Sequence, residues 1–191
     1  MAWVSMKRFF DLILGVLLSG PALMVVVAIL PIIWLETRAN PLFRQNRVGR
    51  DGRVFVMVKL RTMRADTPNL ASHEIGSDAI TGLGRLLRRT KIDELPQLWN
   101  VLRGEMSMVG PRPCLPNQLE LIAERARRGV MALRPGITGI GQLAGLDMSE
   151  PIALADADAI YLSRWTLQRD LGLLCQTVTG RGRGDAAVTK K

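Results

Sequence analysis

The sequence has few of the residues from which most metal centres and secreted scaffolds are built. It contains two cysteines, Cys114 and Cys175, and a single histidine, His73. Two cysteines exclude a disulfide framework, and one histidine excludes a multi-histidine metal site. The aromatic residues are four Phe, four Trp and one Tyr, too few to favour a surface on which nucleic-acid bases stack.

Positive charge is in excess. Lys and Arg number 26 against 17 Asp and Glu, which gives a formal net charge of +9 over 191 residues. Most of the cations are arginine, whose forked guanidinium matches the geometry of phosphate oxygens. The expected partners are therefore anions: nucleic acid, lipid headgroups or a phosphorylated small molecule. The length allows one domain, or one domain with an appendage.

A long uncharged segment lies near the N-terminus. The 24 residues from Leu12 to Leu35 carry no charge. As a helix they would measure about 36 Å, enough to cross a hydrocarbon core of about 30 Å. The segment is too long for a signal peptide and is followed by no small-residue cleavage site. Hydropathy alone therefore predicts a single membrane-spanning helix.

Two features favour a different topology for this segment. Pro21, preceded by Ser19 and Gly20, interrupts the helix, and Pro31 does so again. Lys and Arg flank both ends of the segment, and positive flanks mark the cytoplasmic side. A re-entrant helix–break–helix would place both flanks on one side, with Ser19 as a possible donor to the carbonyls that the break frees. The residues alone leave the span and the hairpin open.

From residue 39 the pattern predicts a small, predominantly helical α/β domain. A β-favouring run is followed by amphipathic segments, one of them with leucines on one face and arginines around it. The predicted strand covers 54–58, and the predicted helices cover 79–90, 93–104, 115–131 and 153–169. Pro–Gly segments predict loops at 108–113 and 134–139. The basic tail over 180–191 is predicted to be disordered.

Two adjacent carboxylates, Asp93 and Glu94, stand at a predicted helix start. Acidic residues there have an ordinary explanation, because they interact with exposed N–H groups and with the helix dipole. The functional interpretation is that one carboxylate attacks phosphorus or holds a divalent cation while the other assists. Arg88, Arg89 and Arg112 nearby favour this second interpretation.

Several sequence blocks, in order, resemble the monotopic phosphoglycosyl transferases, bacterial sugar transferases that begin glycan assembly on polyprenyl phosphate. The blocks are Lys7-Arg8-Phe9-Phe10-Asp11, Phe43-Arg44-Gln45, Arg47-Val48-Gly49, Lys59-Leu60-Arg61-Thr62-Met63, Asp93-Glu94-Leu95-Pro96-Gln97-Leu98, Gly104-Glu105-Met106-Ser107, Val109-Gly110-Pro111-Arg112-Pro113 and Arg134-Pro135-Gly136-Ile137-Thr138-Gly139. Together they extend over nearly the whole chain.

The resemblance implies a topology and a location. Members of this family have an N-terminal helix that enters the membrane and leaves on the cytoplasmic side, which favours the hairpin. The expected organisation is a re-entrant helix over 1–38, a catalytic domain over 39–179 and a tail over 180–191, at the cytosolic face of the bacterial inner membrane.

The resemblance also implies a reaction. Asp93 would attack a UDP-sugar, expel UMP and form a sugar-phosphoryl aspartate, from which polyprenyl (undecaprenyl) phosphate would take the group. Glu94 would assist, with Mg²⁺ expected at Asp93. Lys59, Arg88 and Arg112 are the expected phosphate contacts. Further site neighbours, on weaker grounds, are Arg61, Arg89, Arg134, Thr138, Gln142, Asp158 and Tyr161.

The sequence departs from the family pattern at two places. Gly20 precedes Pro21 where the family often has Ser, which puts a serine-to-backbone bond at the break in doubt. The segment Leu143–Asp147 lacks an Arg found in many relatives after the Gly, so sugar specificity is expected to differ.

Two other hypotheses are kept. One is a non-enzymatic, single-span module whose Arg-rich domain binds anionic lipid or nucleic acid, and the other is a transferase without a covalent intermediate. The resemblance itself implies no nucleic-acid partner. It leaves the sugar and the oligomeric state open.

Overall fold

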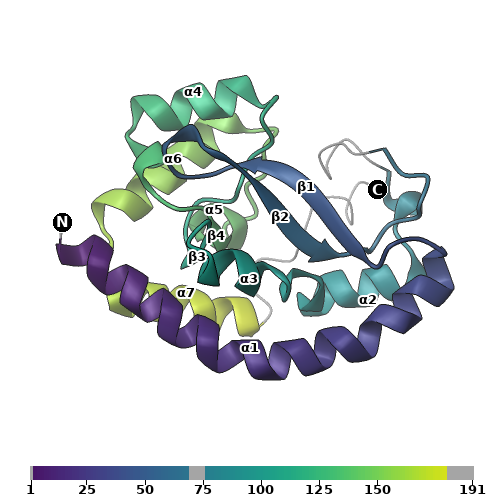
Figure 1. The fold of residues 1–191 in the computed structure, drawn as a ribbon. Helices are drawn as coiled ribbons and strands as arrows, with labels where there is room; N and C mark the ends of the chain where they lie inside the picture. Colours follow the sequence, from purple (N-terminus) through teal and green to yellow (C-terminus); the bar gives the residue numbers. More distant parts are fainter. Residues whose placement is uncertain (1, 69–75, 180–191) are drawn as a thin grey trace.

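The computed structural model describes residues 2–68 and 76–179, so the predicted disorder of 180–191 lies outside the described residues. The fold is predominantly helical, as predicted. In chain order the longer elements are α1 (Ala2–Thr37), β1 (Leu42–Val48), β2 (Val54–Leu60), α2 (Gly82–Thr90), α3 (Gln97–Leu102), β3 (Ser107–Val109), α4 (Leu119–Arg127), β4 (Gly136–Thr138), α5 (Ile140–Leu143), α6 (Pro151–Ser163) and α7 (Leu167–Val178). Figure 1 shows α1 running beneath α7, α3 and α2, with α4 and α6 on the opposite side of the domain.

The apolar segment forms one helix, and not the helix–break–helix that was expected. Pro21 and Pro31 both lie inside α1, which bows along its length in Figure 1 without separating into two helices. Proline removes a helical donor, so a bend at such a position is ordinary. Ser19 Oγ donates to the carbonyl of Gly15 at 2.5 Å within this continuous helix, and not to the carbonyl of Leu17 that Pro21 leaves without its helical donor. Over Val4–Thr37 the helix is long and apolar enough to cross a membrane.

The N-terminal half of α1 is attached to the domain by polar contacts. Lys7 Nζ lies 2.7 Å from Asp170 Oδ2 on α7. Arg8 donates to the last carbonyls of α3, those of Val101 at 2.7 Å and Leu102 at 3.0 Å. Asp11, which is 1 % exposed, accepts hydrogen bonds from the residues of β3. These contacts fix the start of the apolar helix to the protein.

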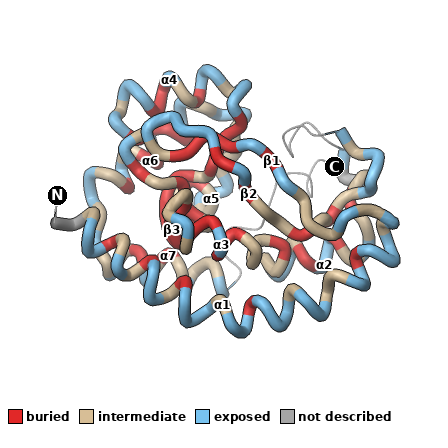
Figure 2. Tube along the Cα trace, viewed as in Figure 1, coloured by how far each residue is buried: buried red, intermediate tan, exposed pale blue. Residues whose placement is uncertain are grey.

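The C-terminal half of α1 is attached to the same domain by apolar packing. Ile33 is buried in a cluster with Leu60 of β2 and Leu87 of α2. Glu36 adds a polar contact, since its Oε1 accepts the N–H of Leu83 at 3.2 Å. Between these attachments most of the helix surface is exposed and apolar, as the outer edge of α1 in Figure 2 shows.

The strands form two pairs, and of their members only β2 was predicted from the sequence. β1 and β2 make an antiparallel hairpin in which Leu42 faces Leu60 and Val48 faces Val54. β3 and β4 form a short parallel pair at positions predicted to be loops. Gly110 and Gly136 allow this pairing, because a Cβ at Gly136 would lie 2.1 Å from the amide nitrogen of Gly110.

Helix boundaries differ most from the prediction in two places. The expected helix near Asp93 is instead a 3₁₀ turn over Ile92–Glu94, followed by the short α3. The predicted helix over 153–169 is two helices, because Thr166 caps a new one by accepting the N–H of Arg169. The turn before α7 brings that helix alongside α1, as Figure 1 shows.

Candidate active site

The two adjacent carboxylates follow a sharp change in chain direction at the end of α2. Lys91 adopts a left-handed conformation with φ of 60°, and the 3₁₀ turn that carries Asp93 and Glu94 follows at once. Asp93 lines a cavity of about 600 Å³, whereas Glu94 lines a second cavity of about 230 Å³. The cavities share a wall formed by Arg47, Met57 and Lys59. Consecutive residues therefore face two adjoining cavities.

Glu94 is buried against cations, and not against the amide groups that a capping role would require. Its Oε1 lies 3.1 Å from Lys59 Nζ. Burial raises the pKa of Glu94, but the charges of Lys59, Arg112 and Lys91 outweigh burial and bring it below its ordinary value. Glu94 is therefore an anion at neutral pH.

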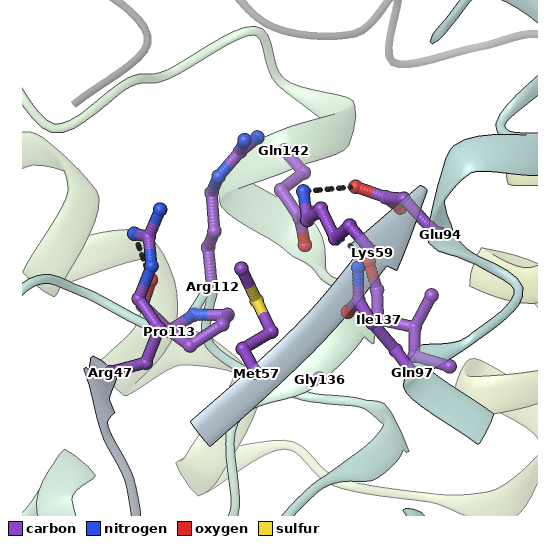
Figure 3. A pocket seen from close by; sticks show the side chains of 10 residues that line it. All are labelled: Arg47, Met57, Lys59, Glu94, Gln97, Arg112, Pro113, Gly136, Ile137 and Gln142. Carbon is purple, nitrogen blue, oxygen red and sulfur yellow. Dashed lines mark hydrogen bonds and ion pairs between the residues drawn. The ribbon is translucent and has the colours of Figure 1, made fainter. Parts of the chain in front are cut away.

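Three buried polar atoms with no hydrogen-bond partner among the described residues meet at the smaller cavity. They are Glu94 Oε2, Gln97 Nε2 and Gln142 Oε1. Figure 3 shows their side chains around this cavity together with Arg112 and Lys59. Buried polar atoms are nearly always paired in folded proteins, so this group indicates a site completed by a polar ligand.

The larger cavity brings Asp93 together with three of the predicted cations. Arg88 reaches it from α2, where its Nε donates to Thr62 Oγ1 at 2.9 Å. Lys59 lines it from β2, and Arg61 lines it from the segment that follows β2. Arg61 is held over the ring of Phe43 and donates to the carbonyl of Asn40 at 2.7 Å. Fixed positive charge thus surrounds a carboxylate that is 7 % exposed.

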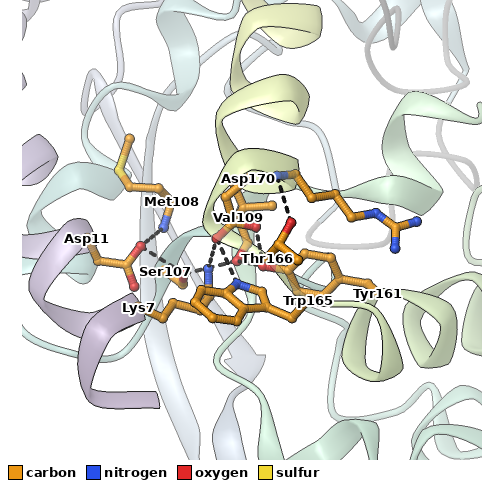
Figure 4. A network of polar contacts seen from close by, with 10 residues as sticks. Lys7, Asp11, Ser107, Met108, Val109, Tyr161, Trp165, Thr166 and Asp170 are labelled. Carbon is orange, nitrogen blue, oxygen red and sulfur yellow. Dashed lines mark hydrogen bonds and ion pairs between the residues drawn. The ribbon is translucent and has the colours of Figure 1, made fainter. Parts of the chain in front are cut away.

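The other predicted site neighbours do not line either cavity. Arg89 is exposed on α2, although it adjoins Arg88 in the sequence. Arg134 donates to the carbonyl of Gly104 at 2.8 Å, and the hydroxyl of Thr138 pairs with that of Thr177. Tyr161 belongs to the network that holds α1 (Figure 4). Asp158 forms a buried ion pair with a residue of α4.

Sequence reasoning did not single out two residues that line these cavities. Arg47 lies in the wall between them, and Gln97 lies beneath Glu94 on the first turn of α3. Both occur in the blocks that carry the family resemblance. The structure buries Gln97 and Asn100 on the face of α3 that packs inward, although both side chains are polar.

The donor set fits a magnesium ion that takes most of its ligands from phosphate and water. No group of three His, Cys, Asp or Glu side chains gathers anywhere in the described residues. Asp93 offers a hard oxygen donor in the larger cavity, and Mg²⁺ is commonly held by one or two carboxylates with substrate phosphates.

Residues 2–182 match the family model described as bacterial sugar transferase. A UDP-glucose:undecaprenyl-phosphate glucose-1-phosphate transferase of Caulobacter vibrioides is 41% identical over 90% of this chain and 68% of its own length. The uncharacterized sugar transferase EpsL of Bacillus subtilis is 37% identical over 91% of this chain and 85% of its own length. An undecaprenyl-phosphate galactose phosphotransferase of Salmonella typhimurium is 30% identical over 95% of this chain, which corresponds to 41% of that longer protein.

Proposed function

The chain belongs to the bacterial sugar transferase family and is a phosphoglycosyl transferase, and from that premise we propose that it transfers a sugar-1-phosphate from a UDP-sugar to undecaprenyl phosphate with release of UMP. The observation that carries the proposal is the pair of adjoining, cation-lined cavities into which Asp93 and Glu94 face. The UDP-sugar carries two phosphates and undecaprenyl phosphate carries one, and fixed guanidinium and ammonium groups are suited to bind them.

The proposed reaction takes place in two displacements at one phosphorus atom. An oxygen of Asp93 bonds to the β-phosphorus of the UDP-sugar, and the anhydride bond breaks so that UMP leaves with the electron pair. A phosphate oxygen of undecaprenyl phosphate then bonds to the same phosphorus, and the bond to Asp93 breaks, which restores the carboxylate. Covalent catalysis of this kind replaces one difficult transfer between two large substrates with two easier ones.

The cations have a defined task in this scheme. A carboxylate that approaches a diphosphate meets like charge, and preorganised positive groups offset that repulsion most strongly where water is excluded. Lys59 and Arg88 line the cavity of Asp93, and Arg112 lines the cavity of Glu94. We assign these three side chains to the phosphates. Glu94, kept ionised by its neighbours, would orient the cations and the polar ligand.

We propose Mg²⁺ as the cofactor, held by Asp93 and by phosphate oxygens of the substrate in the larger cavity. When bound, the ion would neutralise phosphate charge that the arginines leave uncompensated. Omission of Mg²⁺ with a chelator is expected to stop UMP release while the protein remains folded.

We further propose that α1 enters the inner membrane and returns to the cytosolic face. The support is that both ends of α1 contact one domain, through Lys7 and Arg8 at one end and through Ile33 and Glu36 at the other. A helix that crossed the bilayer would hold its ends about 30 Å apart on opposite sides. Ala2→Cys and Asn40→Cys, each introduced with Cys114→Ser and Cys175→Ser, should be labelled from the same side of sealed vesicles. Labelling from opposite sides would establish a span.

UMP release from a panel of UDP-sugars, with undecaprenyl phosphate and Mg²⁺, tests the proposed activity. Wild type should release UMP with one or a few of these donors, and Asp93→Asn should release none while it stays in the membrane fraction. Asp156→Asn, which changes an exposed carboxylate on α6, is the matched control and should retain activity. If no donor yields UMP, the proposed function is wrong. A steep loss of membrane or nucleic-acid binding with salt, without turnover, would favour the non-enzymatic module.

A further inference from the structure

The loop that carries Arg112 is held by its carbonyl groups. Four successive carbonyls each accept one hydrogen bond from another part of the chain. The bonds are Gly136 N to Pro111 O (2.8 Å), Arg125 Nη1 to Arg112 O (2.9 Å), Arg47 Nη1 to Pro113 O (2.9 Å) and Val48 N to Cys114 O (2.9 Å). Because prolines 111 and 113 have no N–H, the loop depends on donors supplied from outside.

Two of these donors are buried guanidinium groups, and Arg125 on α4 is itself held in place. Its Nε and Nη2 lie 2.9 and 2.8 Å from Oδ2 of Asp158 on α6. The side chains are 4% and 3% exposed. Burial of an ion pair seldom adds stability, because removing two charges from water costs about as much as their attraction returns. The pair therefore calls for a role other than stability.

Apolar packing fixes only part of the loop, where Cys114 is buried in a cluster with Val48 and Leu121. A surface pocket of about 260 Å³, open to solvent, adjoins the loop and is lined by Pro111, Cys114, Arg125, Met131 and Leu133 among others. A loop beside such a pocket can shift toward it unless directed bonds hold it. The bonds to its carbonyls therefore act together with the packing of Cys114 to fix the loop that carries Arg112.

We propose that Arg125, oriented by Asp158, is a positioning residue that holds the Arg112 loop so that the Arg112 guanidinium faces the phosphates of the UDP-sugar. The inference rests on the proposed function. It assigns to two buried residues outside both substrate cavities an effect on substrate binding, exerted through one carbonyl oxygen.

The same two helices carry a matched control. Arg128 Nε lies 2.7 Å from Asp156 Oδ1, so this pair also joins α4 to α6. It is more exposed, at 24% and 57%, and within the described part of the chain Arg128 hydrogen-bonds Glu124 and Asp156 but not the loop. Loss of either pair removes an Arg–Asp contact between α4 and α6, but only loss of the Arg125 pair should affect Arg112.

Arg125→Lys is the principal test variant. A lysine keeps the positive charge beside Asp158, but its single nitrogen cannot bond Asp158 and the carbonyl of Arg112 in the same forked geometry. The expected result is a fall of about 10- to 100-fold in kcat/KM for the UDP-sugar, mainly through KM, since small displacements of a positioned group are costly. Arg128→Lys should change kcat/KM less than twofold.

A double-mutant cycle separates positioning from general support of the fold. If Arg125 acts through Arg112, then Arg125→Lys combined with Arg112→Ala should lose no more kcat/KM than Arg112→Ala alone. Additive losses would overturn the proposal, and so would an Arg125→Lys enzyme with wild-type KM. Should Arg125→Lys fail to fold, Asp158→Asn, an isosteric change, takes its place in the cycle with the same criterion.

The outcomes also distinguish this proposal from the proposed function. If Arg112→Ala leaves kcat/KM unchanged while wild type releases UMP, the positioning role is overturned and the reaction stands. If wild type releases UMP from no UDP-sugar, the proposed function fails first.

Discussion

Two lysine–carboxylate pairs, one buried and one partly buried, have the same kind of charge pairing and differ in how completely they are hydrogen-bonded. Lys7 and Asp170 join α1 to α7, and Lys59 and Glu94 lie between the two cavities. Asp170 accepts hydrogen bonds from Lys7 at 2.7 Å, from Tyr161 Oη at 2.7 Å and from Trp165 Nε1 at 3.0 Å, as Figure 4 shows. Glu94 has one such partner, and its second oxygen has none among the described residues.

This difference in hydrogen bonding indicates that the Lys7–Asp170 pair belongs to a structural network and the Lys59–Glu94 pair to a binding site. A fully bonded buried network makes one arrangement of the chain more stable than its alternatives. A buried carboxylate with an unused oxygen costs stability, and such a cost is usual where a ligand supplies the missing partner. The two pairs should therefore respond in opposite ways when each is replaced by apolar residues.

Replacement of the site pair should produce the largest loss of activity. In Lys59→Met combined with Glu94→Leu, UMP release is expected to fall by about 10³-fold or more, because the cation and anion that face the substrates are gone. The free energy of unfolding should stay within about 1 kcal/mol of wild type or rise, since apolar replacements of buried pairs are often neutral or stabilising. UMP assays and denaturant titration check both parts. A large loss of stability would contradict the comparison.

Replacement of the anchoring pair should produce the largest loss of stability. In Lys7→Met combined with Asp170→Leu, the Tyr161 hydroxyl and the Trp165 N–H lose their shared acceptor, at a cost of about 1 to 3 kcal/mol each. Denaturant titration should show a total loss of about 3 to 5 kcal/mol. UMP release per folded molecule should remain within a fewfold of wild type. If activity per folded molecule disappears, the network also belongs to the site.

Adjacent arginines on α2 should differ by about tenfold. Arg88 lines the cavity of Asp93 and bonds Thr62, whereas Arg89 is exposed. Arg88→Lys should lower kcat/KM for the UDP-sugar by about tenfold, because lysine cannot reproduce the forked contact with phosphate. Arg89→Lys serves as the control and should lie within twofold of wild type. Equal losses of kcat/KM in both variants would indicate that the phosphates bind elsewhere.

The smallest expected effect concerns the thiol beside the site loop. Burial raises the pKa of Cys114, and its thiol is 1% exposed, so at pH 7 to 8 little thiolate is available for reaction. A maleimide should label the exposed Cys175 and leave Cys114 unmodified until denaturant is added. Rapid labelling of Cys114 in the native protein would show that the loop opens.

The sequence was sufficient to predict the helical class of the fold, the long apolar helix, and the grouping of Asp93, Glu94, Lys59, Arg88 and Arg112. Local pattern and block order carry that information. The sequence could not show which of Arg88 and Arg89 faces the cavity, because both lie on the polar side of a short amphipathic helix. Only packing against β2 decides which one turns inward.

Tertiary contacts also decide where other predicted residues lie. Tyr161 and Asp158 were predicted as site neighbours, and their contacts with other helices place them in networks that do not line the cavities. Gln97 was not singled out, although it is buried beneath Glu94, since the burial of a polar side chain is decided by the tertiary fold. The expected break in α1 was predicted from Pro21 and Pro31, from the basic residues at both ends of the segment and from the family resemblance. The helix instead accommodates its prolines by bending.

The central claim is that Asp93 becomes covalently bound to the sugar phosphate, and mass spectrometry of one peptide tests it most directly. Trypsin cleavage after Lys91 and Arg103 yields a peptide of residues 92–103 that contains both carboxylates. After incubation with the active UDP-sugar and Mg²⁺, without undecaprenyl phosphate, and an acid quench, this peptide should gain the mass of one sugar phosphate, with the modification on Asp93. Stoichiometric UMP and an unmodified peptide, or an adduct on Glu94, would contradict the account.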